Sequence, residues 1–172
     1  ATNSPINDMF AIHTKQAPYM TYVVGARVPR GSVEDALMWD TLDAYHYVRL
    51  QPLDDGDDLL IIGGEDHKSG QADDADQRHQ RLIDWARERF PIGEVEYTWA
   101  GQWMESIDGL AFIGRNPLDA DNVYVVTGDS GMGMTHGAIA GMLLTDMILG
   151  RQNPWESLYD PSRKNVAATG PF

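Results

Sequence analysis

The sequence predicts an α+β fold in which a mixed, largely antiparallel sheet carries one long helix and is followed by a strand, a glycine-rich loop and a second helix. Two apolar runs, residues 45–50 and 59–62, flank an acidic turn that contains Gly56, which is typical of a β-hairpin. One long amphipathic segment lies at residues 73–90, and a compact apolar run at 122–127 precedes the glycine-rich loop. The 172 residues are enough for such a fold to bury a sizeable core.

The first part of the chain is expected to be mostly strand. Residues 12–28 are rich in Tyr, Val and Thr without a helical period, which predicts one or two strands that end in a turn at 29–31. A short strand is expected at 37–41. The hairpin follows, and the glycines at 63 and 64 end it.

The segment at 73–90 is the clearest helix, because its apolar residues recur every three or four positions and share one face. The residues on this face are Ala75, His79, Leu82, Ile83, Ala86 and Phe90. Pro91 ends the helix. A strand is expected at 94–105, where the even spacing of Trp99 and Trp103 places both on the same face.

The glycine-rich loop at 128–135 is the strongest candidate for chemistry. It follows the run at 122–127, which resembles a buried strand of a parallel sheet, and it opens a helix that continues to Leu149. Glycines let backbone N–H groups approach a ligand, and the helix dipole favours negative charge at this end. The glycine order matches neither the dinucleotide fingerprint nor the P-loop. A simple strand-to-helix turn, with glycines that only allow close packing, is the alternative.

Composition excludes several function classes. The net charge of −13 argues against nucleic-acid binding. The longest mostly apolar stretch, residues 138–149, is too short to span a bilayer, and no apolar leader opens the sequence, so we expect a cytoplasmic protein. The absence of cysteine excludes cysteine-ligated metal sites within these residues. His67 and His79 match no standard ligand spacing, and no metal site is predicted.

Motifs in the second half of the chain carry a family resemblance. Residues 99–101 read Trp-Ala-Gly, residues 109–115 read Gly-Leu-Ala-Phe-Ile-Gly-Arg, and residues 122–128 read Asn-Val-Tyr-Val-Val-Thr-Gly. Together with the loop and the helix at 137–150, they resemble the C-terminal signature of the D-amino-acid oxidase-like superfamily of FAD-dependent oxidoreductases. That superfamily includes enzymes that oxidise glycine, sarcosine and dimethylglycine.

Both ends of the chain extend the resemblance and suggest a fragment. Residues 1–5 resemble the point where the chain leaves the flavin domain, and residues 153–163 resemble a subgroup with a Rieske iron–sulfur domain after the oxidase part. The sequence lacks an initiator Met and the G-x-G-x-x-G unit that holds most of the FAD in this superfamily. We therefore expect residues 1–121 to be the substrate (catalytic) domain, 122–150 to be a flavin-contacting strand, loop and helix belonging to the FAD domain, and 151–172 to be a tail or linker.

The resemblance implies a cofactor site in the loop. Its backbone amides would lie near the pyrimidine end of the flavin and stabilise negative charge on the reduced ring. The contacting residues would be Gly128, Gly131, Met132, Gly133, Met134 and Thr135. The implied reaction is hydride transfer to FAD from a carbon next to an amine nitrogen, with an imine product. The resemblance identifies no catalytic side chain, and we expect weak or absent FAD binding and little or no catalysis by this chain alone.

The implied substrate is an amine or an amino-acid derivative. Members of the superfamily commonly hold a substrate carboxylate with an arginine just after the Trp-x-Gly motif, where this chain has Gln102 and Trp103. The loop has no arginine either, which favours an amine, an N-methylated compound or a larger amino compound. Trp99 and Trp103 would form an aromatic wall for a cationic amine, and a place in the core of the sheet is the alternative.

Two residues of the hairpin are further substrate candidates. Tyr47 resembles a substrate-contacting tyrosine, and Arg49 shares its face of the strand and would pair with an acidic group. Structural and surface roles are the alternatives for both.

The resemblance also implies partner domains. The implied partners are the missing N-terminal FAD domain and a Rieske domain that could take electrons onward. The strand at 122–127 and its helix should expose apolar surface, which self-association into a homo-oligomer would cover. Two other functions remain open: a non-catalytic binding or assembly module with the substrate-domain fold, and a subunit that completes its flavin site with another chain.

Overall fold

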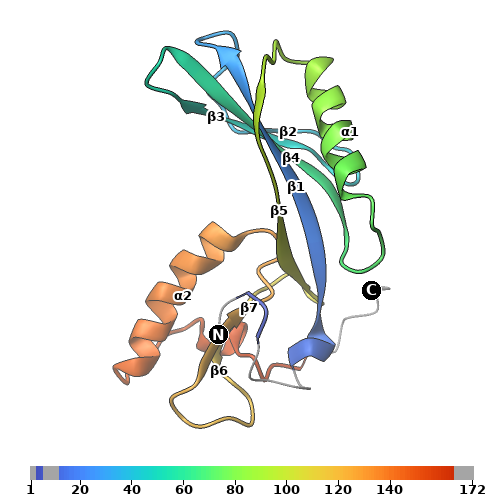
Figure 1. Ribbon diagram of the computed structural model, residues 1–172. Coiled ribbons are helices and arrows are strands. Elements are labelled where there is room, and N and C mark those ends of the chain that lie inside the picture. The colour runs from blue at the N-terminus through green and yellow to red at the C-terminus, as the bar shows by residue number, and fades with distance from the viewer. Residues whose placement is uncertain (1–2, 6–11, 165–172) are drawn as a thin grey trace. The chain divides into compact units, whose positions relative to one another are not determined.

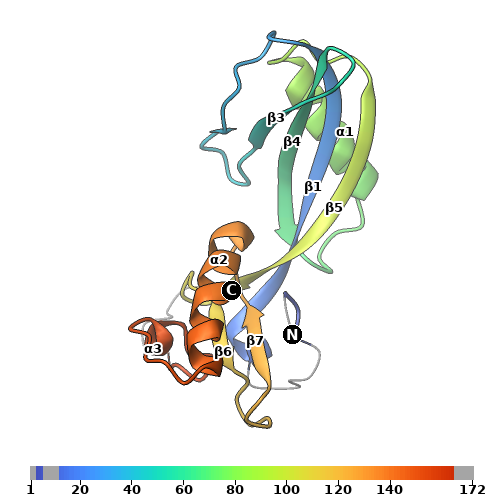
Figure 2. The same cartoon turned by 90° about the vertical axis from the view of Figure 1, so that its left-hand side faces the viewer.

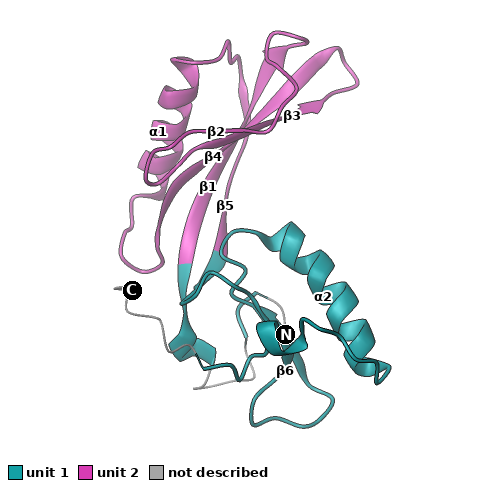
Figure 3. Cartoon of the chain, turned by 180° about the vertical axis from the view of Figure 1, so that it is seen from behind, with its two compact units in different colours: residues 1–18, 103–172 teal, residues 19–102 magenta. Residues whose placement is uncertain are grey.

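The computed structural model of the protein describes residues 3–5 and 12–164. The chain forms two compact units (Figure 3). Residues 19–102 form one unit from a continuous segment, whereas residues 1–18 and 103–172 together form the other. Residues 1 and 2 of the segment that resembles the exit from the flavin domain, and the tail from residue 165 onward, lie outside the described residues.

A five-stranded sheet has the order β2-β3-β4-β1-β5 (Figure 1). Its strands are β1 (Gln16–Pro29), β2 (Met38–Trp39), β3 (Tyr47–Pro52), β4 (Asp57–Lys68) and β5 (Val95–Ser106). The pairs β1–β4, β2–β3 and β3–β4 are all antiparallel. The structure therefore confirms the predicted hairpin and the largely antiparallel sheet.

One helix, α1 (Ala75–Arg87), packs against β4 in the unit of residues 19–102 (Figure 1). Its predicted apolar face is confirmed, because Leu82 and Ala86 are fully buried against sheet residues such as Leu60 and Ile62. Full burial of each large apolar side chain stabilises the fold by about 1.5–3 kcal/mol. Asp76 in the first turn and Arg87 in the last suit the helix dipole.

The other unit contains a two-stranded sheet and the second long helix. Strands β6 (Phe112–Arg115) and β7 (Tyr124–Thr127) pair antiparallel, and α2 (Gly133–Ile148) packs against both, as Figure 2 shows. The apolar run at 122–127 predicted a strand in a parallel sheet, whereas within the described residues the partner of β7 is the antiparallel β6. An apolar run of four residues does not reveal the direction of its neighbour, and β6 itself is too short to show a periodicity.

Short helices complete this unit. A 3₁₀ helix, Ile12–Lys15, stands where a strand was expected to begin, and it buries Ile12 completely in a cluster with Phe112 and Val125. The one-turn helix α3 (Glu156–Tyr159) contacts β6. Tyr159 joins the cluster that Ile113 and Leu143 form between α2 and β6.

Arg163 anchors the segment that follows α3. Its guanidinium pairs with both carboxylate oxygens of Asp108 at 2.9 Å and donates to the carbonyl oxygens of Leu110 and Ala111 at 2.7 and 2.9 Å. It also lies over the ring of Phe112, 3.9 Å from the centroid. Charge-assisted bidentate pairs of this kind are among the strongest protein hydrogen bonds, so Arg163 fixes this segment on the unit.

Candidate functional site

The loop between β7 and α2 has an unusual backbone. Gly128, Ser130 and Gly131 have φ angles of 67°, 50° and 76°, all in the left-handed region. Glycine takes this conformation readily, whereas a residue with a Cβ does so with strain. Ser130 is held there by its backbone N–H, which donates to the carbonyl oxygen of Met104 at 3.0 Å.

Two glycines of the loop face different surroundings. A Cβ on Gly128 would lie 3.1 Å from Gln16 Oε1, Phe112 Cδ2 and Ser106 Cβ, so this glycine is enclosed by buried side chains. A Cβ on Gly131 would meet nothing within 4 Å. The loop therefore has a packed base at Gly128 and an open side at Gly131.

The open side continues onto the first turn of α2. Residues 131–135 are all exposed, with Met132 at 60% and Met134 at 93%. The N-cap position of α2 is Met132, which makes no side-chain hydrogen bond to the first turn. The amides of a first helical turn have no partner within the helix, so those at the start of α2 are placed to bind an acceptor.

Asp129 and His136 brace the loop. The Nδ1–H of His136 donates to the backbone carbonyl of Asp129 at 3.0 Å, because a carbonyl oxygen can only accept. Asp129 Oδ2 lies 2.8 Å from the position of a Cβ on Gly133, next to the start of α2. A carboxylate there offsets part of the helix dipole's attraction for anions, which favours a neutral oxygen acceptor over a phosphate.

The end of β5 meets the loop at Ser130. The backbone N–H of Ser106 donates to Ser130 Oγ at 3.3 Å, and the two hydroxyl oxygens are 3.3 Å apart. Burial raises the pKa of Glu105, the Ser130 hydrogen bond opposes this rise, and the nearby negative charge of Asp129 adds to it.

The three substrate candidates fall in different units. Trp103 is half-buried on β5, in the same unit as the loop. Tyr47 and Arg49 lie on β3 in the unit of residues 19–102, where Tyr47 is half-buried and Arg49 is exposed. Their substrate roles stay predictions.

Tyr47 packs against a glycine on the neighbouring strand. Gly63 is its register partner on β4, and a Cβ there would lie 2.0 Å from Tyr47 Cζ. The Tyr47 hydroxyl is 3.3 Å from Thr21 Oγ1, and burial raises the pKa of the phenol. Trp99 is 43% exposed, so the alternative of a core position does not hold for this tryptophan.

Comparison with known proteins decides the family. The model of the FAD-dependent oxidoreductase (DAO) family matches residues 6–147. The chain belongs to this family. The predicted resemblance is thereby confirmed, and FAD is the cofactor of the family.

Known proteins resemble this chain in sequence or in fold. The protein named putative Rieske 2Fe-2S iron-sulfur protein YhfW, from Bacillus subtilis (strain 168), is 35% identical over 108 residues, which are 63% of this chain and 21% of that protein. The crystal structure of glycine oxidase from Geobacillus kaustophilus matches 88% of this chain and 40% of that one, with a TM-score of 0.69 and 16% identity. Iminodiacetate oxidase (IdaA) from Chelativorans sp. BNC1 matches 86% and 40%, with a TM-score of 0.63 and 17% identity.

The chain thus spans about a fifth of the curated relative and two fifths of these structures. The Rieske name of the curated relative bears out the predicted association with that subgroup. The loop at 128–135 fits the cofactor, because the exposed Gly131 and the uncapped first turn of α2 offer backbone donors on the open side of the loop. No helix among the described residues is long and apolar enough to cross a membrane.

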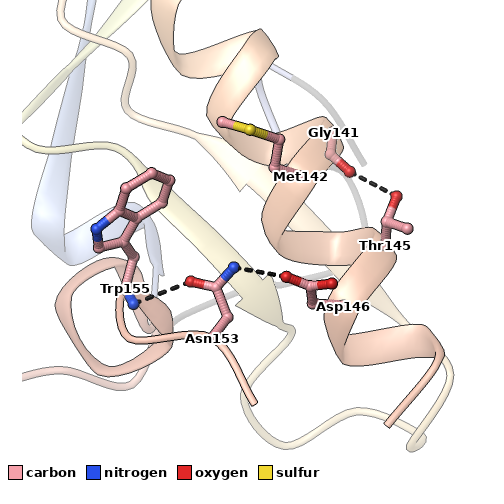
Figure 4. Close-up of a pocket in the computed structure, with 6 residues that line it drawn as sticks. All are labelled: Gly141, Met142, Thr145, Asp146, Asn153 and Trp155. Atoms are coloured by element: carbon pink, nitrogen blue, oxygen red, sulfur yellow. Dashed lines mark hydrogen bonds between the residues drawn. The ribbon is translucent and has the colours of Figure 1, made fainter. Parts of the chain in front are cut away.

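A pocket of about 500 Å³ lies along α2, apart from every predicted site residue (Figure 4). Met142 and Trp155 border it, and the Asn153 amide donates to Asp146 Oδ2 at 2.8 Å at its edge. The two histidines considered for metal binding have structural contacts instead. His67 hydrogen-bonds the Tyr22 hydroxyl at 3.0 Å, and His79 packs edge-on against the Tyr22 ring.

Sequence reasoning missed the residues that support the loop. Ser130 contacts Ser106 at the end of β5, 24 residues earlier in the sequence, and His136 hydrogen-bonds the Asp129 carbonyl, seven residues earlier. A serine inside a glycine-rich run was the one available signal, since a hydroxyl there often bonds nearby backbone.

Proposed function

We propose that this chain is part of an FAD-dependent oxidoreductase that oxidises a C–N bond of an amine or amino-acid derivative. The observation that carries the proposal is the loop at 128–135, because its exposed backbone N–H groups lie at the uncapped start of α2. The chain that carries this loop belongs to an FAD-dependent family. The printed names of structural relatives, glycine oxidase and iminodiacetate oxidase, support an amine or amino-acid substrate class. FAD, when bound, supplies a hydride acceptor for the carbon next to the nitrogen.

We also propose a role for each segment of the chain. Residues 1–121 would provide the substrate domain, 122–150 the segment that contacts FAD, and 151–172 a tail or linker. Gly128, Gly131, Met132, Gly133, Met134 and Thr135 would contact FAD through the backbone of the loop. Tyr47, Arg49 and Trp103 would contact the substrate.

The apolar character of α2 supports a fold that extends beyond this chain. One side of the helix packs on β6 through Leu143 and Ala140, whereas Met134, Met142 and Ile148 are 93%, 51% and 65% exposed. A helix that is apolar all round is normally buried all round. The remainder of the family fold, about three fifths of the glycine oxidase structure, would cover the second side. Without it, we expect the isolated chain to self-associate.

Residues next to the Trp-Ala-Gly motif support an amine over a simple α-amino acid. Gln102 and Trp103 occupy the positions where a carboxylate-binding arginine would be expected. Residues 129–132 of the loop include no arginine either. An indole face attracts a cationic amine. The proposed partners are the missing FAD-binding part and, from the name of the curated relative, a Rieske domain. A cytoplasmic location is part of the proposal.

A visible absorbance spectrum tests the proposal. The 172-residue chain and a longer protein that includes the rest of the family fold are each mixed with FAD and desalted. We expect flavin bands to be retained by the longer protein and lost from the 172-residue chain. Anaerobic addition of glycine, iminodiacetate or benzylamine should then bleach the bound flavin with at least one of these probes. A longer protein that retains no flavin would favour the assembly-module alternative.

A further inference from the structure

Arg163 uses its whole guanidinium to fix the segment that follows α3. All five of its N–H groups face an oxygen: two donate to the Asp108 carboxylate at 2.9 Å, and three donate to backbone carbonyls at 2.7–3.2 Å. These carbonyls belong to Leu110, Ala111 and Tyr159. The Arg163 side chain is only 11% exposed. Residues 159–163 are therefore held firmly on the segment that leads into β6.

Phe112 contacts both Arg163 and the base of the glycine-rich loop. The Arg163 guanidinium lies over the ring face, 3.9 Å from its centroid, and the ring is fully buried. At the ring edge, Phe112 Cδ2 lies 3.1 Å from the position of a Cβ on Gly128. Phe112 is also the register partner of Thr127 in the β6–β7 pair, directly before the loop. One phenyl ring therefore connects the Arg163 contacts with the first residue of the loop.

Lys15 and Gln16 form a second connection between the same two regions. Lys15 Nζ donates to the carbonyl oxygens of Pro161 and Arg163, both at 2.9 Å. The next side chain, that of Gln16, is 7% exposed, and its Oε1 lies 3.1 Å from the position of a Cβ on Gly128. Two buried contacts thus reach Gly128, and each leads back to the segment that Arg163 fixes.

The backbone of the loop depends on support from its neighbours. Gly128 and Ser130 have left-handed φ angles of 67° and 50°, and this conformation is strained for a residue with a Cβ such as Ser130. Such strain persists only where the surrounding structure fixes it. Nothing lies within 4 Å of a Cβ on Gly131, so the open side gives no support. The contacts at Gly128 and the hydrogen bond from Ser130 to Met104 therefore set the direction of the loop amides.

We propose that Arg163 is a positioning residue for FAD, because its contact with Phe112 holds the base of the flavin-contacting loop. This role rests on the proposed function. Every hydrogen bond of the Arg163 side chain goes to residues outside the loop, so its effect reaches the loop through Phe112. Loss of the guanidinium frees the ring, gives Gly128 more space and lets the loop amides lose their alignment. A displacement of residues 159–163 would therefore weaken FAD binding.

The FAD affinity of Arg163→Gln tests this role, with Arg151→Gln as the matched control. Arg151 belongs to the same unit and has a carboxylate partner, Asp146 at 3.7 Å, but its side chain is 64% exposed. Both variants are made in the longer protein that includes the rest of the family fold, and each apoprotein is titrated with FAD. Mutations within a contact network of this kind change affinity by about 2–30-fold. We expect Arg163→Gln to weaken FAD binding by that factor and Arg151→Gln to bind FAD as the unmodified protein does.

Hydrogen exchange of the apoprotein separates positioning from a general loss of stability. Peptides that cover the loop at 128–135 and the helix at 137–148 are compared by mass spectrometry. Arg163→Gln should speed exchange in the loop and leave the helix peptide unchanged, whereas a purely structural role would speed both alike. Arg163→Lys keeps a cation next to Phe112 but has only three N–H donors, so its effects should lie between those of Arg163→Gln and the unmodified protein.

The outcomes separate this inference from the proposed function. Unchanged FAD affinity in Arg163→Gln, or equal acceleration of exchange in both peptides, would overturn the inference and leave the proposed function intact. If Arg163→Gln does not fold, Arg163→Lys decides by the same two measurements. If the unmodified longer protein binds no FAD, the proposed function fails and this inference fails with it.

Discussion

Replacement of Gly128 and Gly131 by alanine separates backbone strain from packing in the candidate flavin loop. Both glycines have left-handed φ angles, 67° and 76°, so each alanine carries a backbone penalty of about 1–2 kcal/mol. The new methyl group of Gly131→Ala meets nothing within 4 Å. That of Gly128→Ala lies 3.1 Å from three buried atoms, and overpacking of this kind adds about 1–3 kcal/mol.

Gly128→Ala should therefore destabilise the protein by about 2–5 kcal/mol and Gly131→Ala by about 1–2 kcal/mol. Urea unfolding followed by circular dichroism measures both free energies. The difference between the two variants isolates the packing contribution, because their backbone contributions are matched. Equal losses, or a larger loss for Gly131→Ala, would refute the view that the base of the loop is packed and its open side is free.

Three other substitutions test separate parts of the structure. Gly63→Ala should displace the Tyr47 ring and bring the pKa of its phenol down toward the ordinary value, which titration of phenolate absorbance measures; an unchanged pKa would contradict the contact. Leu143→Ala should lower the free energy of unfolding by about 2–5 kcal/mol in a urea titration, whereas Met142→Ala, at an exposed neighbouring position, should stay within about 0.5 kcal/mol. Glu105→Gln should raise the melting temperature at neutral pH, since the raised pKa makes the folded state lose stability as pH rises through it. A melting temperature that rises with pH equally in both proteins would exclude this effect.

Local patterns were sufficient to predict much of the fold. The α1 face with Leu82 and Ala86 could be read from its period, and the β3–β4 hairpin from two apolar runs around a turn. The pairing of β7 could not be predicted, because four apolar residues carry no information about the partner strand. The strand β6 and the 3₁₀ helix at Ile12–Lys15 were missed for the same reason, since tertiary packing rather than local propensity stabilises such short elements.

The candidate site was predictable only in part. The glycine spacing indicated the loop at 128–135, and the exposed first turn of α2 agrees with a ligand-binding role. The neighbours of the loop depend on long-range contacts that no local pattern encodes. Ser106 and Ser130 show this, since a serine at the end of a strand gives no sign that its backbone N–H will donate to a serine 24 positions later.

The order of the two units along the chain has a consequence for folding kinetics. The unit that carries the loop is built from residues 1–18 and 103–172, so the whole of residues 19–102 must be bridged before it can form. Closing a flexible loop of that length costs about 4 kcal/mol from the (3/2)RT ln n dependence on length. The continuous unit of residues 19–102 has no such barrier, and its folding would draw the two ends of that loop closer together before the second unit assembles. A core substitution in α1, such as Leu82→Ala, would then slow formation of the candidate flavin loop without touching it.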